Sequence, residues 1–180
     1  MFLQIEIEER FQLPFKTGSH FLVFACPEHD DPTIGKNIWG TGQPAEQLPP
    51  EYWNDNRGQY SLFLFSPGTC EPTAERDSYL VHSELQFSPK HSSEDDWDTF
   101  LIGGKTPWVD TPQEWRCSCG APMQFLCVIP ENFEFKKLPE AQLQPNSFCQ
   151  DYGLFLGNIL YFLACKAQCN PRAVFCVMQN

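Results

Sequence analysis

Two pairs of closely spaced cysteines constrain this chain more than any other feature of its sequence. Cys117 and Cys119 form the first pair, and Cys165 and Cys169 form the second. A structural zinc ion takes four thiolate or imidazole ligands in a tetrahedron, and two short cysteine-bearing turns can supply them two by two. The sequence therefore predicts a zinc site with these four cysteines as ligands. Because four protein ligands leave no position for water, the predicted role of the zinc is structural rather than hydrolytic.

The spacing leaves two other interpretations open. The pairs are Cys-x-Cys and Cys-x₃-Cys, whereas the regular zinc pattern is Cys-x₂-Cys. On a regular strand Cys117 and Cys119 would point to one face and be packed there, which describes a reduced structural cluster. A redox-active pair is the third alternative. Gly120 favours a metal, because glycine after the second cysteine lets the backbone turn tightly and direct N–H groups at a sulfur.

Motifs for catalysis are missing from the sequence. It contains no nucleophile elbow, phosphate-binding glycine loop or zinc-protease helix, so we predict no catalytic and no cofactor-binding residues. His29 near Cys26, and His82 with His91, could form a second site, but single histidines and cysteines on apolar strands are usually core residues. A cysteine–histidine dyad stays open as an alternative, because its members need only be close in space.

Composition predicts one globular domain over residues 1–180. An apolar fraction of 42% and an aromatic fraction of 14% can supply one hydrophobic core at this length. The N-terminus carries acids where a secretory signal has basic residues, and no apolar run is long enough to cross a bilayer. We therefore expect a cytoplasmic protein that does not enter the membrane. Its nine cysteines should be reduced, as apolar residues or metal ligands.

The net charge of -11 indicates which class of partner the protein can bind. Nucleic acid is not an expected partner, because binding phosphates requires a cluster of Lys and Arg. The acidic blocks 28–31 and 94–98 favour a protein partner with a basic surface. The alternative is a solvated surface that only keeps the protein monomeric. The sequence does not define the oligomeric state.

The hydrophobic pattern predicts a mainly β fold with mostly antiparallel sheets and at most two short helices. Residues 20–26 form a continuous apolar run that is typical of a strand buried on both faces. Residues 152–156 and 159–164 flank Gly157-Asn158, which favours a hairpin, and a short helix is expected from Ser92 to about Leu101. The other predicted strands are 3–7, 59–65, 79–87, 123–129, 133–135 and 173–178. The tryptophans lie in or beside irregular segments, and we interpret them mainly as lids over the β core.

An internal duplication would give two related halves, residues 1–90 and 91–180. The segment 21–32 aligns with 160–171 through a shared Ala-Cys pair and a shared final Pro, and Ile34-Gly35-Lys36 resembles Ile102-Gly103-Gly104-Lys105. In this alignment Asp30 stands where Cys169 does, so only the C-terminal half would hold metal.

Several motifs in the C-terminal half resemble those of the YwqG-like bacterial proteins, a family of unknown function. They are IGGKTPW (102–108), CSCGAPMQFL (117–126), GLFLGN (153–158) and the closing Gln179-Asn180. More remotely, the Cys-Gly-x-Pro-Met and Tyr-Phe-x-x-Cys elements resemble the C-terminal module of the programmed cell death protein two family, which has more regular cysteine pairs. That family implies a chaperone for a ribosomal protein, and YwqG-like proteins near toxin genes imply an acidic immunity role. Neither resemblance implies catalytic residues.

Together these observations predict a non-enzymatic, cytosolic protein-binding module with a structural zinc site, acting as an immunity or chaperone-like protein for a basic partner. The alternative is a cysteine-dependent enzyme or thiol redox protein. A third alternative is a small-molecule sensor with a pocket between two sheet halves.

Overall fold

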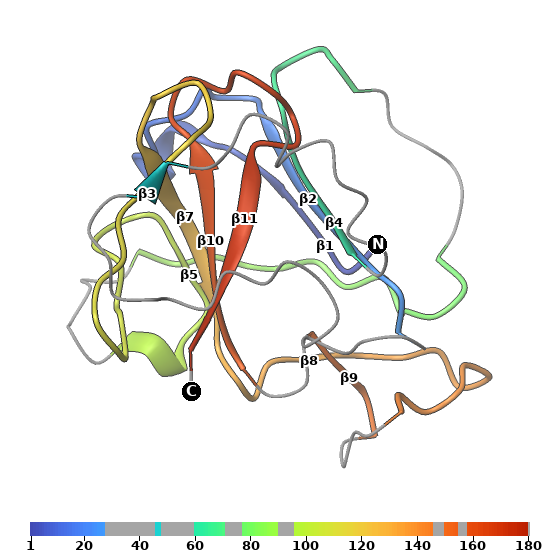
Figure 1. Ribbon diagram of the computed structural model, residues 1–180. Helices are drawn as coiled ribbons and strands as arrows, with labels where there is room; N and C mark the ends of the chain where they lie inside the picture. Colours follow the sequence, from blue (N-terminus) through green and yellow to red (C-terminus); the bar gives the residue numbers. More distant parts are fainter. Residues whose placement is uncertain are drawn as a thin grey trace.

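The computed structural model describes residues 1–27, 46–47, 60–70, 77–89, 96–145, 150–154 and 158–179. Two antiparallel sheets dominate this part of the chain (Figure 1). The three-stranded sheet has the order β1 (Leu3–Glu6), β2 (His20–Ala25), β4 (Tyr60–Phe65). The four-stranded sheet has the order β11 (Val174–Gln179), β10 (Ile159–Cys165), β7 (Met123–Ile129), β5 (Leu101–Ile102). The predicted mainly β, antiparallel fold is confirmed.

Two small strand pairs and two 3₁₀ turns complete the described elements. β3 (Glu46–Gln47) runs parallel to β6 (Trp115–Arg116), and β8 (Glu134–Phe135) is antiparallel to β9 (Tyr152–Gly153). The 3₁₀ turns are η1 (Glu9–Phe11) and η3 (Asp96–Asp98). None of the helices in the described ranges has the length and apolar character needed to span a bilayer.

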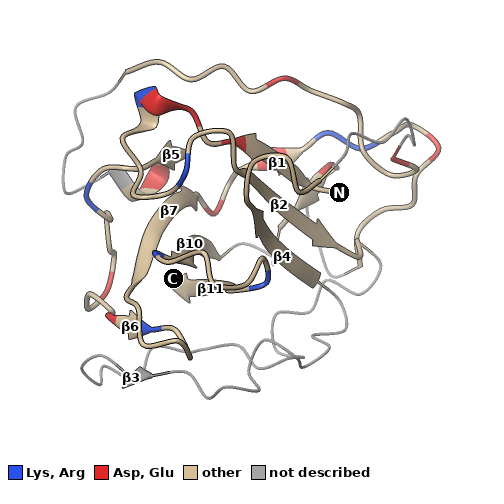
Figure 2. Cartoon of the chain, turned by 90° about the horizontal axis from the view of Figure 1, so that it is seen from above, with Lys and Arg blue, Asp and Glu red and all other residues tan. Residues whose placement is uncertain are grey.

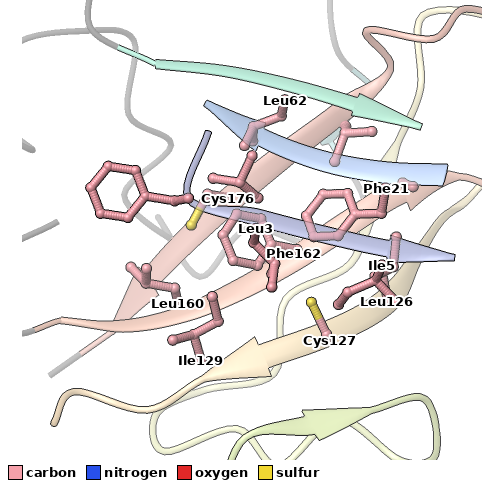
Figure 3. Close-up of a cluster of buried hydrophobic side chains, with 14 of the residues drawn as sticks. Leu3, Ile5, Phe21, Leu62, Leu126, Cys127, Ile129, Leu160, Phe162 and Cys176 are labelled. Carbon is pink, nitrogen blue, oxygen red and sulfur yellow. The ribbon is translucent and has the colours of Figure 1, made fainter. Parts of the chain in front are cut away.

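The two main sheets pack face to face through alternate residues of their strands (Figure 3). Leu3 and Ile5 of β1 are buried while the residues between and after them are exposed, as a half-buried strand requires. Phe21 of β2 meets Phe162 of β10 with ring centroids 5.2 Å apart. The prediction that β2 is buried on both faces is wrong, because Phe24 on its other face is 39% exposed.

Cys127 of β7 and Cys176 of β11 lie inside this core, where Figure 3 shows both sulfurs among apolar side chains. Burial raises the pKa of both thiols well above the ordinary value. They therefore remain protonated and pack as small apolar residues.

The other face of the four-stranded sheet is covered by the segment that leads from β5 through β6. The Trp108 ring lies over Tyr161 with centroids 4.5 Å apart, and Trp115 meets Phe175 edge to face at 5.6 Å. The Tyr161 hydroxyl donates to the Pro107 carbonyl at 2.9 Å, and burial raises the pKa of Tyr161 to about 12. Strands β10 and β11 are consequently buried along their whole length. For these two tryptophans the interpretation as lids is confirmed.

Three local predictions differ from the structure. Residues 81–89 form no strand, and Leu80 alone makes an antiparallel bridge, to Lys137. The predicted 152–164 hairpin is wrong because β9 pairs with β8 while β10 pairs with β7 and β11. The start of the predicted helix at Ser92 lies outside the described residues. Its described part contains the 3₁₀ turn η3 and reaches the first residue of β5, with no α-helix.

The proposed duplication stays a prediction. Its alignment superimposes β2 on β10, and each lies between two neighbours in its own sheet. Asp30 and the 34–36 segment lie outside the described residues.

Candidate metal centre

The first cysteine turn follows β6. The backbone N–H of Gly120 donates to the Cys117 carbonyl, and that of Cys117 donates to the Ala121 carbonyl, both at 2.8 Å. Gly120 has a φ of +86°, and a Cβ at that position would meet no atom within 4 Å. The turn therefore requires glycine for its left-handed backbone and not for space. The tight turn predicted at Gly120 is confirmed.

The second cysteine turn connects β10 to β11. The N–H of Gln168 donates to the Cys165 carbonyl at 2.9 Å, and Gln168 itself is left-handed with a φ of +46°. The two turns are also bonded to each other, because the Lys166 N–H donates to the Pro122 carbonyl at 3.0 Å. Figure 1 places both connections at the same end of the four-stranded sheet.

The four predicted cysteines meet between these turns. The Sγ atoms of Cys117 and Cys169 are 3.5 Å apart, and those of Cys119 and Cys165 are 3.6 Å apart. All four Sγ atoms lie within 4.8 Å of one another. A tetrahedral ion with bonds of about 2.3 Å to sulfur requires sulfur–sulfur separations of about 3.8 Å. The cluster therefore has the dimensions of a four-thiolate metal cage.

Each turn contributes one buried and one exposed cysteine. Cys117 and Cys165 are 0% and 1% exposed, whereas Cys119 and Cys169 lie at the surface. The cage is thus closed by protein on its inner side and borders solvent on its outer side. A metal would reach it without unfolding of the core.

The thiols of the cage differ in acidity. A hydrogen bond from the Ala121 backbone N–H lowers the pKa of Cys119 to about 7. Burial raises the pKa of Cys165 and of Cys169, and neighbouring thiols raise them further. Four thiolates repel one another in so small a volume, so full ionisation requires a cation between them.

The segments that carry the four cysteines contain basic residues and no acidic ones. The segments 115–130 and 158–179 contain three cations, Arg116, Lys166 and Arg172, and no Asp or Glu. The connection between β10 and β11 accordingly shows blue and no red in Figure 2. The Arg116 guanidinium donates to the Gly120 carbonyl at 3.1 Å, across the first turn. Because four thiolates with one divalent ion carry a net charge of about -2, these cations favour the loaded cage.

The other predicted candidates do not join the cluster. His29 and His91 lie outside the described residues, Cys26 is half-buried, and His82 is exposed. Among the described residues, the four cysteines are the group of His, Cys, Asp or Glu close enough to hold a metal.

Sequence reasoning missed the residues that tie the second turn to the first sheet. Gln168 Nε2 donates to Ser19 Oγ at 3.0 Å, and Gln168 Oε1 accepts from the Lys16 N–H at 3.1 Å. The Leu64 N–H of β4 donates to the Pro171 carbonyl at 2.8 Å. No local pattern marks these residues, since Gln168 and Ser19 are separated by 149 positions.

No protein-family model, curated protein or solved structure matches the chain.

Proposed function

We propose that the chain is a non-enzymatic protein-binding module whose second sheet is stabilised by one structural zinc ion bound to Cys117, Cys119, Cys165 and Cys169. The observation that carries the zinc site is the meeting of four Sγ atoms within 4.8 Å, drawn from two turns about fifty residues apart. An all-thiolate tetrahedral site favours zinc over magnesium or calcium, which take oxygen ligands. With four protein ligands the ion has no open position, so its role is structural.

A metal bound in this cage would order the two turns and also the contact between the two main sheets. The second turn carries Gln168 and Pro171, whose hydrogen bonds reach Ser19 in the β1–β2 connection and Leu64 in β4. Ordering the turn therefore also orders the contact between the two main sheets. Because the binding free energy of a structural metal adds to the stability of the fold, zinc would stabilise both sheets together.

The protein-binding role is supported by charge. The net charge is -11, yet segments 115–130 and 158–179 contain no acid, so the carboxylates lie on the rest of the chain. Such a surface attracts a protein with a basic patch. The resemblance to YwqG-like and programmed cell death protein two modules supports an immunity or chaperone-like role. The four cysteines of the cage, together with Cys70, Cys127 and Cys176, are free thiols, which supports a cytoplasmic location.

Metal analysis of natively purified protein tests the zinc site. We expect one zinc per chain in the unaltered protein and less than about a tenth of that in Cys165→Ser, because three thiolates hold zinc far less tightly than four. Cys70→Ser is the matched control, since Cys70 is a free, half-buried thiol outside the cage. Full zinc content in Cys165→Ser would contradict the assignment.

Charge reversal tests the partner. Asp95→Lys combined with Asp96→Lys should abolish capture of a basic protein partner from the native cell, and addition of salt should weaken capture by the unaltered chain. Undiminished capture by the reversed variant would remove the acidic surface from the proposal while leaving the zinc site in place.

A thiol redox role is the second candidate, because Cys119 is exposed, has a pKa lowered to about 7, and lies 3.6 Å from Cys165 sulfur to sulfur. Reversible formation of a Cys119–Cys165 disulfide in zinc-free and zinc-loaded protein alike would favour it. Protection of both thiols by zinc favours the structural site.

A further inference from the structure

A cavity of about 520 Å³ lies beside the first cysteine turn. Four parts of the chain line it: residues 12–14 of the β1–β2 connection, the covering segment between Gly104 and Arg116, residues 122–125 at the start of β7, and Leu163 of β10. This volume lies within the range of about 300–1,000 Å³ that is usual for small-molecule sites. The cavity is separate from the four sulfurs, although Arg116 and Pro122 border both.

Two tryptophans give the cavity an aromatic wall. Trp108 is half-buried and its ring is held over Tyr161, while Trp115 is 8% exposed and packs on Phe175. The Trp115 Nε1 donates to Gln113 Oε1 at 3.3 Å, which fixes both side chains at the lining. Trp115 therefore backs the wall, while the half-buried ring of Trp108 can offer an apolar surface at little entropic cost.

The lining of the cavity also contains basic side chains. Lys105 and Arg116 line the cavity with one carboxylate, that of Glu114. The lining therefore carries an excess of positive charge in a chain whose net charge is -11. One N–H of Arg116 donates to the Gly120 carbonyl. A guanidinium has five N–H donors, and this bond holds it in place while leaving others for a carboxylate or phosphate.

The backbone around the cavity is tightly constrained. Gln12 has a φ of +51°, a conformation uncommon for a residue other than glycine. At Gly103 a Cβ would lie 2.6 Å from the Phe11 carbonyl oxygen, so only glycine allows the covering segment to approach the β1–β2 connection. The covering segment and the β1–β2 connection are therefore in close contact. Because these two walls are held together by the fold, the cavity is formed before a ligand enters.

We propose that this cavity binds a small aromatic ligand that carries one carboxylate or phosphate group. The ring stacks on Trp108, and the anionic group is bound by Arg116 with Lys105 nearby. The proposal rests on the cavity, its aromatic wall and its charge, and is independent of whether the cage holds zinc.

Calorimetric titration of the purified protein with 2-naphthoate and with 2-naphthyl phosphate tests the proposal and distinguishes the two anionic groups. We expect saturable one-to-one binding of at least one of them. Neutral 2-naphthalenemethanol, which lacks the charge, and acetate, which lacks the ring, should each bind at least tenfold more weakly. Absence of saturable binding by both naphthyl anions would overturn the proposal.

Two variants locate the site. Arg116→Gln should weaken binding of the naphthyl anion at least tenfold, whereas Arg172→Gln, which removes an exposed cation outside the cavity lining, should change it less than twofold. Trp108→Leu should weaken binding similarly, with the exposed Trp97→Leu as its control. Near-ultraviolet circular dichroism verifies that Arg116→Gln is folded. Equal affinities of a folded Arg116→Gln and Arg172→Gln would overturn the assignment.

Discussion

Replacement of Gln168 by alanine tests whether the second cysteine turn holds the two sheets together. The substitution removes the bonds to Ser19 Oγ and to the Lys16 N–H, at 3.0 and 3.1 Å. Each bond contributes about 0.5–1.5 kcal/mol, and a buried hydroxyl left without a partner costs about 1–3 kcal/mol. Ser19 is 0% exposed, but Gln168 is half-buried, so water replaces part of the loss. We expect the free energy of unfolding to fall by about 2 kcal/mol.

Urea unfolding of zinc-loaded protein measures this loss. With a denaturant dependence of about 2 kcal/mol/M, the midpoint should fall by about 1 M. Zinc content should not change, because Gln168 supplies no sulfur. Gln86→Ala alters an exposed glutamine outside the cage and should change stability by less than about 0.5 kcal/mol. A Gln168→Ala variant no less stable than Gln86→Ala would refute the coupling of the two sheets through this turn.

Three further predictions concern other parts of the molecule. In zinc-free protein, alkylation of Cys119 by iodoacetamide should reach half its maximal rate near pH 7, because the pKa of Cys119 is lowered to about 7 and the thiolate predominates above that value. Mass spectrometry of the peptide that contains Cys119 measures the alkylation rate. A midpoint near pH 9 would contradict the lowered pKa. Partial burial acts to raise the pKa of Asp77, but hydrogen bonds from the terminal ammonium and two backbone N–H groups lower it on balance. The ionised Asp77 carboxylate therefore stabilises the fold above a pH of about 4, and this stabilisation is lost as the pH falls through the lower pKa of the folded state. Asp77→Asn should accordingly reduce the melting temperature at pH 7 and not at pH 2. Phe162→Ala should cost about 3–5 kcal/mol of unfolding free energy by opening a cavity where Phe162 contacts Phe21, and a loss below 1 kcal/mol by urea unfolding would argue against the face-to-face core.

The sequence was most informative where the local pattern carried the whole structural signal. Leu3 and Ile5 alternate with polar residues, and β1 forms there with the expected inward face. The cysteine pairs were equally informative, because short turns at the end of a sheet can be recognised from spacing and Gly120 alone. The pairing of β7 with β10 brings the two turns to the same end of the sheet, and the apolar character of both strands favours this pairing.

Errors arose where partners distant in sequence decide the structure. The segment 79–87 alternates as a strand does, yet only Leu80 makes a β bridge, because a strand forms only beside another strand. β10 pairs with β7 and β11 rather than with β9, since a longer partner buries more apolar surface than a local hairpin. The cavity beside Trp108 could not be predicted for the same reason, because its walls come from four separate segments.

The most direct test of the zinc site is X-ray absorption at the zinc edge of natively purified protein. We expect one first shell of four sulfur atoms at about 2.3 Å and no oxygen or nitrogen ligand. A shell containing oxygen or nitrogen, or protein that carries no zinc and cannot be loaded with it, would contradict the assignment of a four-cysteine zinc site.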